Sequence, residues 1–186
     1  MPTNALANPL VLPILGLLVE QPRHAYAVFA ELRRRYAYLT VRNATVYTLL
    51  NTLADEGWVE TANHAVKPVL ATTPRGRKAF AEIVDRQLRT AHPADGAAFM
   101  TALAYLGILT PATASHALQD RLTLIAAERR KTQQLVTESG AAELHMIEAH
   151  FYLNRLTEDA NWIERTIHRI EAGQLSWPVS HGPTSP

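Results

Sequence analysis

Short hydrogen-bonding side chains gather between residues 42 and 51. They are Arg42, Asn43, Thr45, Thr48 and Asn51. Arginine and asparagine can each make two hydrogen bonds to the edge of a guanine or an adenine, and threonine can contact a phosphate or a thymine methyl group. The pattern therefore indicates a helix face that reads base pairs. In the alternative interpretation, Asn43 only caps a helix and the threonines are solvated.

Basic side chains nearby are candidates for phosphate contacts. Arg33, Arg34 and Arg35 follow one another, and His64 and Lys67 lie in a polar loop further along the chain. The arginines also suit the negative C-terminal end of a helix, which is the alternative role. Residues 1–92 hold 11 Lys and Arg against 7 Asp and Glu, whereas residues 93–186 hold 7 against 10. A basic N-terminal half is typical of a protein that contacts a polyanion.

Four helices and a hairpin are expected to position these side chains. The first helix runs to Gln21 and is apolar on most of its circumference, so Leu10 and Ile14 must be buried in a core or against a second subunit. The second helix carries an apolar stripe, which we predict to be Tyr26, Phe29, Leu32 and Tyr36.

The third helix is predicted to open at Asn43 as its N-cap and to end at Gly57, a left-handed C-cap. Its buried stripe is predicted to be Val46, Leu49, Leu50 and Leu53. Tyr47 lies between the two faces, where its hydroxyl can donate to a phosphate or its ring can pack beneath the helix. Residues 58–61 and 69–72 then read as the two strands of a hairpin, and Thr73-Pro74 opens a fourth helix.

Beyond residue 92 the sequence reads as helices over roughly 96–109, 112–138 and 141–172. In the last of these an apolar seam repeats every three or four residues, as in a coiled coil. Its members include Leu156, Ile163, Ile167 and Ile170. We predict that this seam, together with Leu10 and Ile14, forms a dimer interface. Residues 1–92 are the expected DNA-binding domain, 93–175 a helical dimerisation domain and 176–186 a flexible tail.

Other function classes find little support in the residues. The chain has no cysteine, so disulfides and thiolate metal sites are excluded. His145 and His150 are five residues apart and point about 140° apart on a helix, so no metal or cofactor is expected. No catalytic arrangement is recognisable, and the run Leu10–Val19 is too short to span a bilayer. We therefore expect a cytoplasmic protein that is not an enzyme.

Several segments at fixed spacing resemble the PadR family of transcription regulators. They are Ile14–Leu18 (ILGLL), Pro22–Tyr26 (PRHAY), Ala44–Val59 (ATVYTLLNTLADEGWV) and Thr73–Arg77 (TPRGR). The resemblance covers residues 10–90, and it implies a mainly α-helical fold. In this fold a winged helix-turn-helix with a two-stranded wing precedes a C-terminal helical dimerisation region. The sequence departs from the family at Ala25, where a glycine is usual, and in the wing, which has one lysine and Leu70 in place of a tyrosine.

The resemblance implies a homodimeric repressor that binds pseudo-palindromic double-stranded operator DNA and is released by a small apolar or aromatic effector. The predicted DNA contacts are Arg33, Arg34, Arg42, Asn43, Thr45, Tyr47, Thr48, Asn51, His64 and Lys67. Aromatic residues of the C-terminal half could line the effector pocket or simply pack the core: Phe99, Tyr105, Phe151, Tyr152 and Trp162. The weakly basic wing favours an alternative function, a dimeric small-molecule-binding protein with reduced DNA affinity. An enzyme on the same scaffold is a weaker alternative.

Overall fold

The computed structural model describes residues 5–62 and 68–177, which are mainly helical with one small antiparallel sheet. This confirms the predicted fold class. The chain forms two compact units. The N-terminal unit contains residues 1–84 and 100–105, and the C-terminal unit contains residues 85–99 and 106–186. The predicted division at residue 92 into a DNA-binding and a dimerisation domain stays a prediction.

The N-terminal unit is built around helix α1 (Val11–Glu20), which packs against α2 (Ala25–Arg35), α3 (Asn43–Asp55) and strand β3 (Val69–Thr72). Eight of its ten residues are buried, as expected for a helix without a polar face. The exposed fractions of Leu10 and Ile14 are 2% and 0% within the single chain. The structure therefore corrects their assignment to a dimer interface, because the chain's own elements already cover both side chains.

The buried stripe of helix α2 agrees with the predicted one at Leu32 and Tyr36, but it includes Val28 in place of Tyr26 and Phe29. Val28 and Leu32 are fully buried and Tyr36 nearly so, whereas the Tyr26 side chain is 67% exposed. The ring of Phe29 packs against that of Tyr26 with 6.2 Å between centroids. Val28, Leu32 and Tyr36 recur every four residues, so they share a face as well as the predicted set does. The sequence pattern alone could not choose between the two faces.

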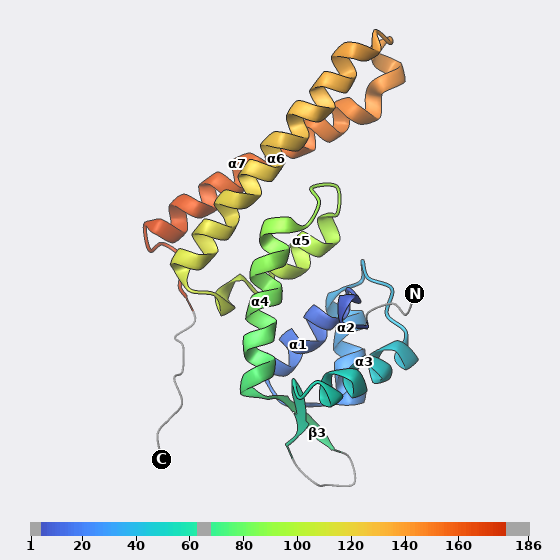
Figure 1. The fold of residues 1–186 in the computed structure, drawn as a ribbon, viewed down its shortest axis with the longest axis vertical. Helices are drawn as coiled ribbons and strands as arrows, with labels where there is room; N and C mark the ends of the chain where they lie inside the picture. The colour runs from blue at the N-terminus through green and yellow to red at the C-terminus, as the bar shows by residue number, and fades with distance from the viewer. Residues whose placement is uncertain (1–4, 63–67, 178–186) are drawn as a thin grey trace. The chain divides into compact units, whose positions relative to one another are not determined.

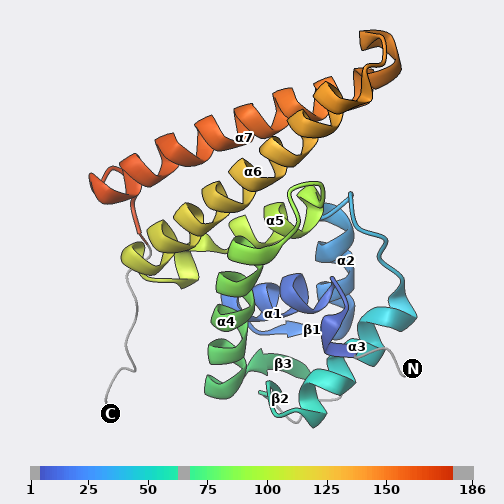
Figure 2. The same cartoon turned by 45° about the horizontal axis from the view of Figure 1, so that its top comes forward.

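The sheet has the strand order β1-β3-β2 (Figure 2), with β1 at Arg23–His24, β2 at Val59–Thr61 and β3 at Val69–Thr72. The predicted hairpin corresponds to β2 and β3, which pair antiparallel with Val59 opposite Thr72. Strand β1 was not predicted. It pairs with β3 on the other edge, where the His24 ring nitrogen Nδ1 hydrogen-bonds the Pro68 carbonyl at 3.0 Å.

The C-terminal end of α3 and the N-terminal end of α4 (Pro74–Thr90) adjoin the β2–β3 hairpin in the chain. Gly57 has a φ of 70°, as predicted for the residue that ends α3. Thr73 caps α4 as predicted, because its Oγ1 accepts a hydrogen bond from the Gly76 N–H at 3.0 Å. The same hydroxyl donates to the Gly57 carbonyl at 2.7 Å, so one side chain joins the two helix ends.

The C-terminal unit is dominated by two long helices, α6 (Pro111–Ser139) and α7 (Ile147–Glu171), which pack antiparallel along their length (Figure 1). Short helices η2 (Leu106–Ile108) and η3 (Glu143–Met146) precede them, and α5 (Gly96–Leu103) and η1 (Ala5–Ala7) complete the fold. The predicted helices were thus correctly located, with the 96–109 segment split in two.

The apolar seam of α7 is covered by the same chain. Leu156 and Ile163 are 0% and 1% exposed, and Ile167 and Ile170 are each 6% exposed. Because α7 packs along α6, the seam faces the neighbouring helix of the single chain and not a second subunit. The assignment of these four residues to a dimer interface is corrected accordingly.

The end of the described chain is attached to the C-terminal unit. The Trp177 indole N–H donates to the Leu109 carbonyl at 2.7 Å. Most of the predicted flexible tail, from residue 178 on, lies outside the described residues. No helix within residues 5–62 and 68–177 is long and apolar enough to cross a membrane.

Candidate nucleic-acid interface

Helix α3 is held by one face, which leaves the opposite face exposed. The predicted stripe is confirmed, since Val46, Leu49, Leu50 and Leu53 are all at most 4% exposed. Because these residues are packed within the N-terminal unit, the positions between them point outward. We call α3 the reading helix below.

The exposed face is centred on Asn43, Tyr47 and Asn51, which recur every four residues. Asn43 is not the N-cap. That position is taken by Arg42, whose side chain makes no capping hydrogen bond. Within residues 5–62 and 68–177 the Asn43 amide has no hydrogen bond, and Tyr47 is 42% exposed. The structure therefore removes the capping role that competed with base reading at Asn43, and it places Tyr47 on the exposed face.

Thr45 and Thr48 lie at the edge of this face. Both line a groove of about 570 Å³ between the reading helix and the N-terminal segment Ala5–Pro9. Thr45 is partly buried there, and the Thr48 hydroxyl donates to the Ala44 carbonyl at 3.0 Å. With its proton used within the helix, Thr48 can offer only its lone pairs and its methyl group to a ligand.

The three consecutive arginines are not equivalent. Arg34 Nε and Nη2 donate to the two oxygens of Glu31 at 2.8 and 2.6 Å. Arg35 pairs with Glu31 and also with Glu20, at 2.6 Å. The hydrogen bond from Arg34 is the main reason why the pKa of Glu31 falls to about 2, and Arg35 adds to the effect. Glu31 is thus ionised at any physiological pH and holds both guanidinium groups.

Arg33 and Arg42 differ from these two arginines. Neither makes an ion pair with a carboxylate in the part of the chain that the structure describes. Arg33 is exposed and lies 5.8 Å from the centroid of the Phe29 ring. The Glu31 pairs at spacings of three and four were visible in the sequence, and they could have distinguished Arg33 from its neighbours. Two predicted contacts, His64 and Lys67, lie outside the described residues.

The comparison with known families bears on this segment directly. Residues 14–82 match the model of the transcriptional regulator PadR-like family. This segment is therefore similar to a PadR-like transcriptional-regulator domain. The reading helix, the β2–β3 hairpin and the first half of α4 all lie inside the matched residues. In the predicted winged helix-turn-helix, α3 takes the place of the second helix, which is the helix that enters the major groove in that motif.

Several solved structures are similar to this chain at low identity. Bacillus subtilis PadR in complex with operator DNA shares 20% identity, with a TM-score of 0.39 over 88% of this chain and 99% of that one. The same protein in complex with p-coumaric acid shares 19% identity, with a TM-score of 0.41 over 88% of this chain and 99% of that one. The Vibrio cholerae virulence activator AphA shares 19% identity, with a TM-score of 0.40 over 88% of this chain and 94% of that one. None of the curated protein sequences matches.

The aromatic residues predicted for an effector pocket do not form one group. Tyr105 belongs to the N-terminal unit with the PadR-like domain, and the other four belong to the C-terminal unit. Phe151 and Trp162 are 70% and 43% exposed, so they line no closed cavity. Phe99 and Tyr152 are each stacked near a guanidinium group. The arginine carbon Cζ lies 4.4 Å from the Phe99 centroid for Arg121 and 5.1 Å from the Tyr152 centroid for Arg155.

Arg121 and Arg155 are residues that the sequence analysis missed. Arg121 is only 2% exposed, and burial lowers the pKa of its guanidinium group. It donates to the Ala91 carbonyl, and Arg155 donates to the Pro93 carbonyl at 2.6 Å. Ala91 directly follows α4, so Arg121 satisfies a backbone acceptor at a helix end, and Arg155 holds the segment that follows. Their positions on helical segments gave no sequence signal, because arginines usually lie on the surface.

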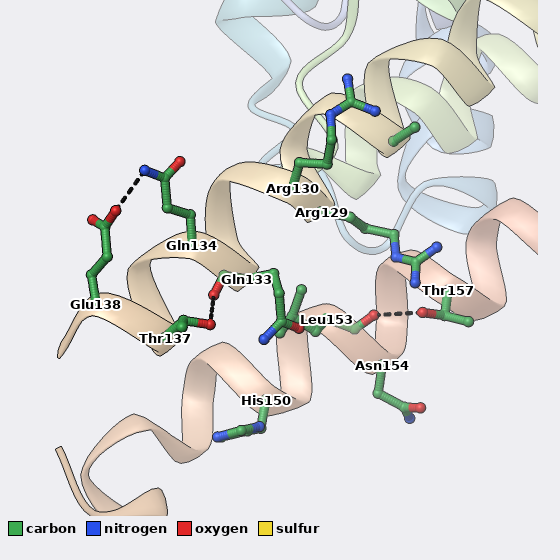
Figure 3. Close-up of a pocket in the computed structure, with 11 residues that line it drawn as sticks. Arg129, Arg130, Gln133, Gln134, Thr137, Glu138, His150, Leu153, Asn154 and Thr157 are labelled. Carbon is green, nitrogen blue, oxygen red and sulfur yellow. Dashed lines mark hydrogen bonds between the residues drawn. The ribbon is translucent and has the colours of Figure 1, made fainter. Parts of the chain in front are cut away.

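An open groove of about 910 Å³ lies between α6 and α7 (Figure 3). Its lining mixes apolar atoms with polar side chains, among them Arg129, Gln133, His150 and Asn154. None of the five predicted effector aromatics lines it. Within the described residues no group of three or more His, Cys, Asp or Glu side chains could hold a metal ion.

Proposed function

We propose that the protein is a repressor that reads operator DNA with the exposed face of α3. The observation that carries the proposal is the polar, uncharged face formed by Asn43, Tyr47 and Asn51 within a PadR-like domain. Asparagine can pair with an adenine edge through two hydrogen bonds, and tyrosine can donate to a phosphate. Arg42, at the N-terminal end of the helix, and Arg33 supply positive charge beside this face. Such a regulator acts on the chromosome, so we propose the cytoplasm as its location.

Substitutions should separate base reading from phosphate contact. Asn51→Ala should weaken binding to the preferred duplex by about 1–3 kcal/mol while leaving binding to random DNA nearly unchanged, because it removes a base contact. Arg33→Ala should weaken both about equally and make the salt slope of log K shallower by about 0.9. Fluorescence anisotropy at several salt concentrations measures both effects. Arg34→Ala is the matched control, since its charge is already paired with Glu31.

Equal losses on specific and random DNA for Asn51→Ala would contradict base reading by this face. The duplex to use is the region upstream of the protein's own gene. If the wild-type protein binds this duplex no better than random DNA, the alternative function as a small-molecule-binding protein is the better account. The pairing of Arg34 and Arg35 within the chain favours that alternative, because it leaves fewer free cations for phosphate.

We propose that the protein dimerises through the outer surface of the α6–α7 hairpin near its turn. Four large apolar side chains are exposed there: Leu144 (76%), Phe151 (70%), Leu135 (56%) and Ile147 (53%). Exposed apolar groups gathered in one region are typical of an interaction site. Acidic residues surround the turn, such as Glu143 and Glu148, and α6 carries the basic run Arg129–Lys131. Two antiparallel copies would bring unlike charges together, and the two-fold symmetry predicts a pseudo-palindromic operator.

The double substitution Phe151→Asp, Ile147→Asp should convert the dimer to a monomer. Both side chains are exposed in the single chain, so charge there disrupts a subunit contact without unfolding the helices. Light scattering after size exclusion gives the mass, and far-UV circular dichroism confirms that the helices persist. Arg165→Asp, an exposed charge change on α7 outside the apolar patch, should leave the mass unchanged. A double variant that stays dimeric at micromolar concentration would show that another surface forms the dimer.

We propose that a small apolar or aromatic effector releases the repressor from DNA. The support is the PadR-like domain joined to a helical unit with aromatic side chains, of which Phe99 and Tyr152 lie beside guanidinium groups. A mobility-shift assay with and without low-molecular-weight extracts of the host cell tests this step. Loss of the shifted band with the extract is expected, and an unchanged band with every fraction would contradict it.

A further inference from the structure

Residues 100–105 lie outside the PadR-like domain in sequence but inside the N-terminal unit in space. The segments on both sides of them, 85–99 and 106–186, belong to the C-terminal unit. The chain therefore leaves the helical unit, contributes six residues to the unit that carries the reading helix, and returns. Of these six residues, Thr101 and Ala102 are 3% and 0% exposed and so are part of the packed core.

Tyr105 contacts several residues of the N-terminal unit. Its hydroxyl accepts a hydrogen bond of 2.6 Å from the Tyr36 hydroxyl. Its ring meets Phe80 edge to face, with 5.1 Å between centroids. On its other side is Gly16, where a Cβ atom would overlap the Tyr105 ring. The absence of a side chain at residue 16 is thus what makes room for Tyr105.

Tyr36 and Tyr38, which contact residues 105 and 101, lie at the start of the connection to the reading helix. Tyr36 follows the last residue of α2, and residues 36–42 join it to Asn43. Tyr38 packs edge-on against Tyr36, with 6.0 Å between ring centroids, and its hydroxyl shares a hydrogen bond of 3.1 Å with Thr101. Two hydroxyl pairs thus tie the 36–38 end of this connection to residues 101 and 105.

The bond between Tyr36 and Tyr105 is the stronger constraint, because it is the better shielded from water; Tyr38 is 46% exposed. Tyr36 is 5% exposed, and burial raises the pKa of both Tyr36 and Tyr105. Neither phenol ionises in the physiological range, so the hydrogen bond persists there. Removal of one hydroxyl leaves its partner buried without that bond, which costs more than an exposed pair would.

We propose that Tyr105 is a positioning residue for DNA reading: through Tyr36 it holds the 36–42 connection, and thereby the reading helix, in the orientation that fits the major groove. The proposal rests on the proposed function and extends it. Residue 105 is followed directly by η2 and α6, so it is also covalently placed to pass a change in the helical unit to the reading helix.

Tyr105→Phe tests the proposal with the least disturbance, because the ring stays between Gly16 and Phe80. Hydrogen–deuterium exchange of the free protein should show faster exchange of the amides in residues 36–46, and unchanged exchange in α6 and α7. Affinity for the preferred duplex should fall about 3- to 10-fold, as expected for the loss of one buried hydrogen bond, and affinity for random DNA should stay within about twofold. Random DNA is held by phosphate contacts, which demand less of the helix orientation.

A double-mutant cycle separates positioning from general destabilisation. Tyr36→Phe should reproduce both effects, and Tyr36→Phe with Tyr105→Phe should add little to either single change. Tyr26→Phe is the control, since that side chain is exposed and distant in sequence from the 36–42 connection. Gly16→Ala, which pushes the Tyr105 ring aside, should act like Tyr105→Phe or more strongly.

Unchanged exchange in residues 36–46 of Tyr105→Phe would overturn the proposal whatever the DNA result. Equal loss on specific and random DNA, or fully additive single changes, would also overturn it and assign Tyr105 a purely structural role. A wild-type protein without preference for its upstream duplex would instead refute the proposed function. The exchange measurement distinguishes these failures because it uses the protein without DNA.

Discussion

Ile163→Asp should unfold the α6–α7 hairpin and not merely separate subunits. Ile163 is 1% exposed within the single chain, on the face of α7 that packs along α6. Deletion of a buried isoleucine side chain costs about 2–5 kcal/mol, and a carboxylate in its place adds the cost of burying or protonating a charge. The sum is comparable with the whole stability of a small domain, about 5–15 kcal/mol. Urea unfolding followed by circular dichroism should show loss of helix at low denaturant.

The matched control is Arg165→Asp, which places a carboxylate on the exposed side of the same helix. Its unfolding midpoint should stay close to that of the wild type, since exposed substitutions rarely change stability by more than about 0.5 kcal/mol. If Ile163→Asp instead remains fully helical and becomes monomeric, the seam faces a second subunit and the intramolecular packing of α7 is wrong. Molecular mass and helix content, measured together, thus show whether the seam packs against α6 or against a second subunit.

The α7 seam shows what an apolar pattern can and cannot predict. The spacing of Leu156, Ile163 and Ile167 correctly predicted a long helix with one buried face. It could not predict the partner, because a heptad-like pattern is the same whether the facing helix belongs to this chain or to another. The exposed side chains that suggest a subunit contact, such as Phe151, do not continue the seam, and only the structure distinguishes them from core residues.

The reading helix was predicted more completely than its surroundings. Local signals specified its buried stripe and its end at Gly57, because both depend on residues close in sequence. Its N-cap was wrong by one residue, a typical uncertainty at helix ends. The contacts that orient it could not be predicted, since Tyr36 and Tyr105 are separated by 69 residues. A tyrosine in a sequence does not indicate which distant residue it contacts. Strand β1 was missed for the same reason, because two residues form a strand only where β3 offers an edge.

Phe80→Ala should destabilise the N-terminal unit by about 3–5 kcal/mol, the usual cost of removing a buried phenylalanine ring. Phe80 is 1% exposed on α4, and its ring supports Tyr105 edge to face. The aromatic pair adds about 0.5–1.5 kcal/mol beyond the buried area, so the loss should lie toward the upper end of that range. Chemical denaturation of the full-length protein measures the change. Because the two compact units need not unfold together, each transition is fitted separately.

Phe80→Leu and Tyr26→Ala make the result interpretable. Leucine keeps most of the buried volume but removes the ring contact with Tyr105, so its cost should lie well below that of alanine. Tyr26→Ala removes a larger aromatic side chain from the same unit, but one that is 67% exposed, and should cost less than about 1 kcal/mol. If Phe80→Ala proved no more costly than Tyr26→Ala, Phe80 would not be packed as the structure shows. The ring contact between Phe80 and Tyr105 would then be wrong. The proposal that Tyr105 positions the reading helix would be wrong with it.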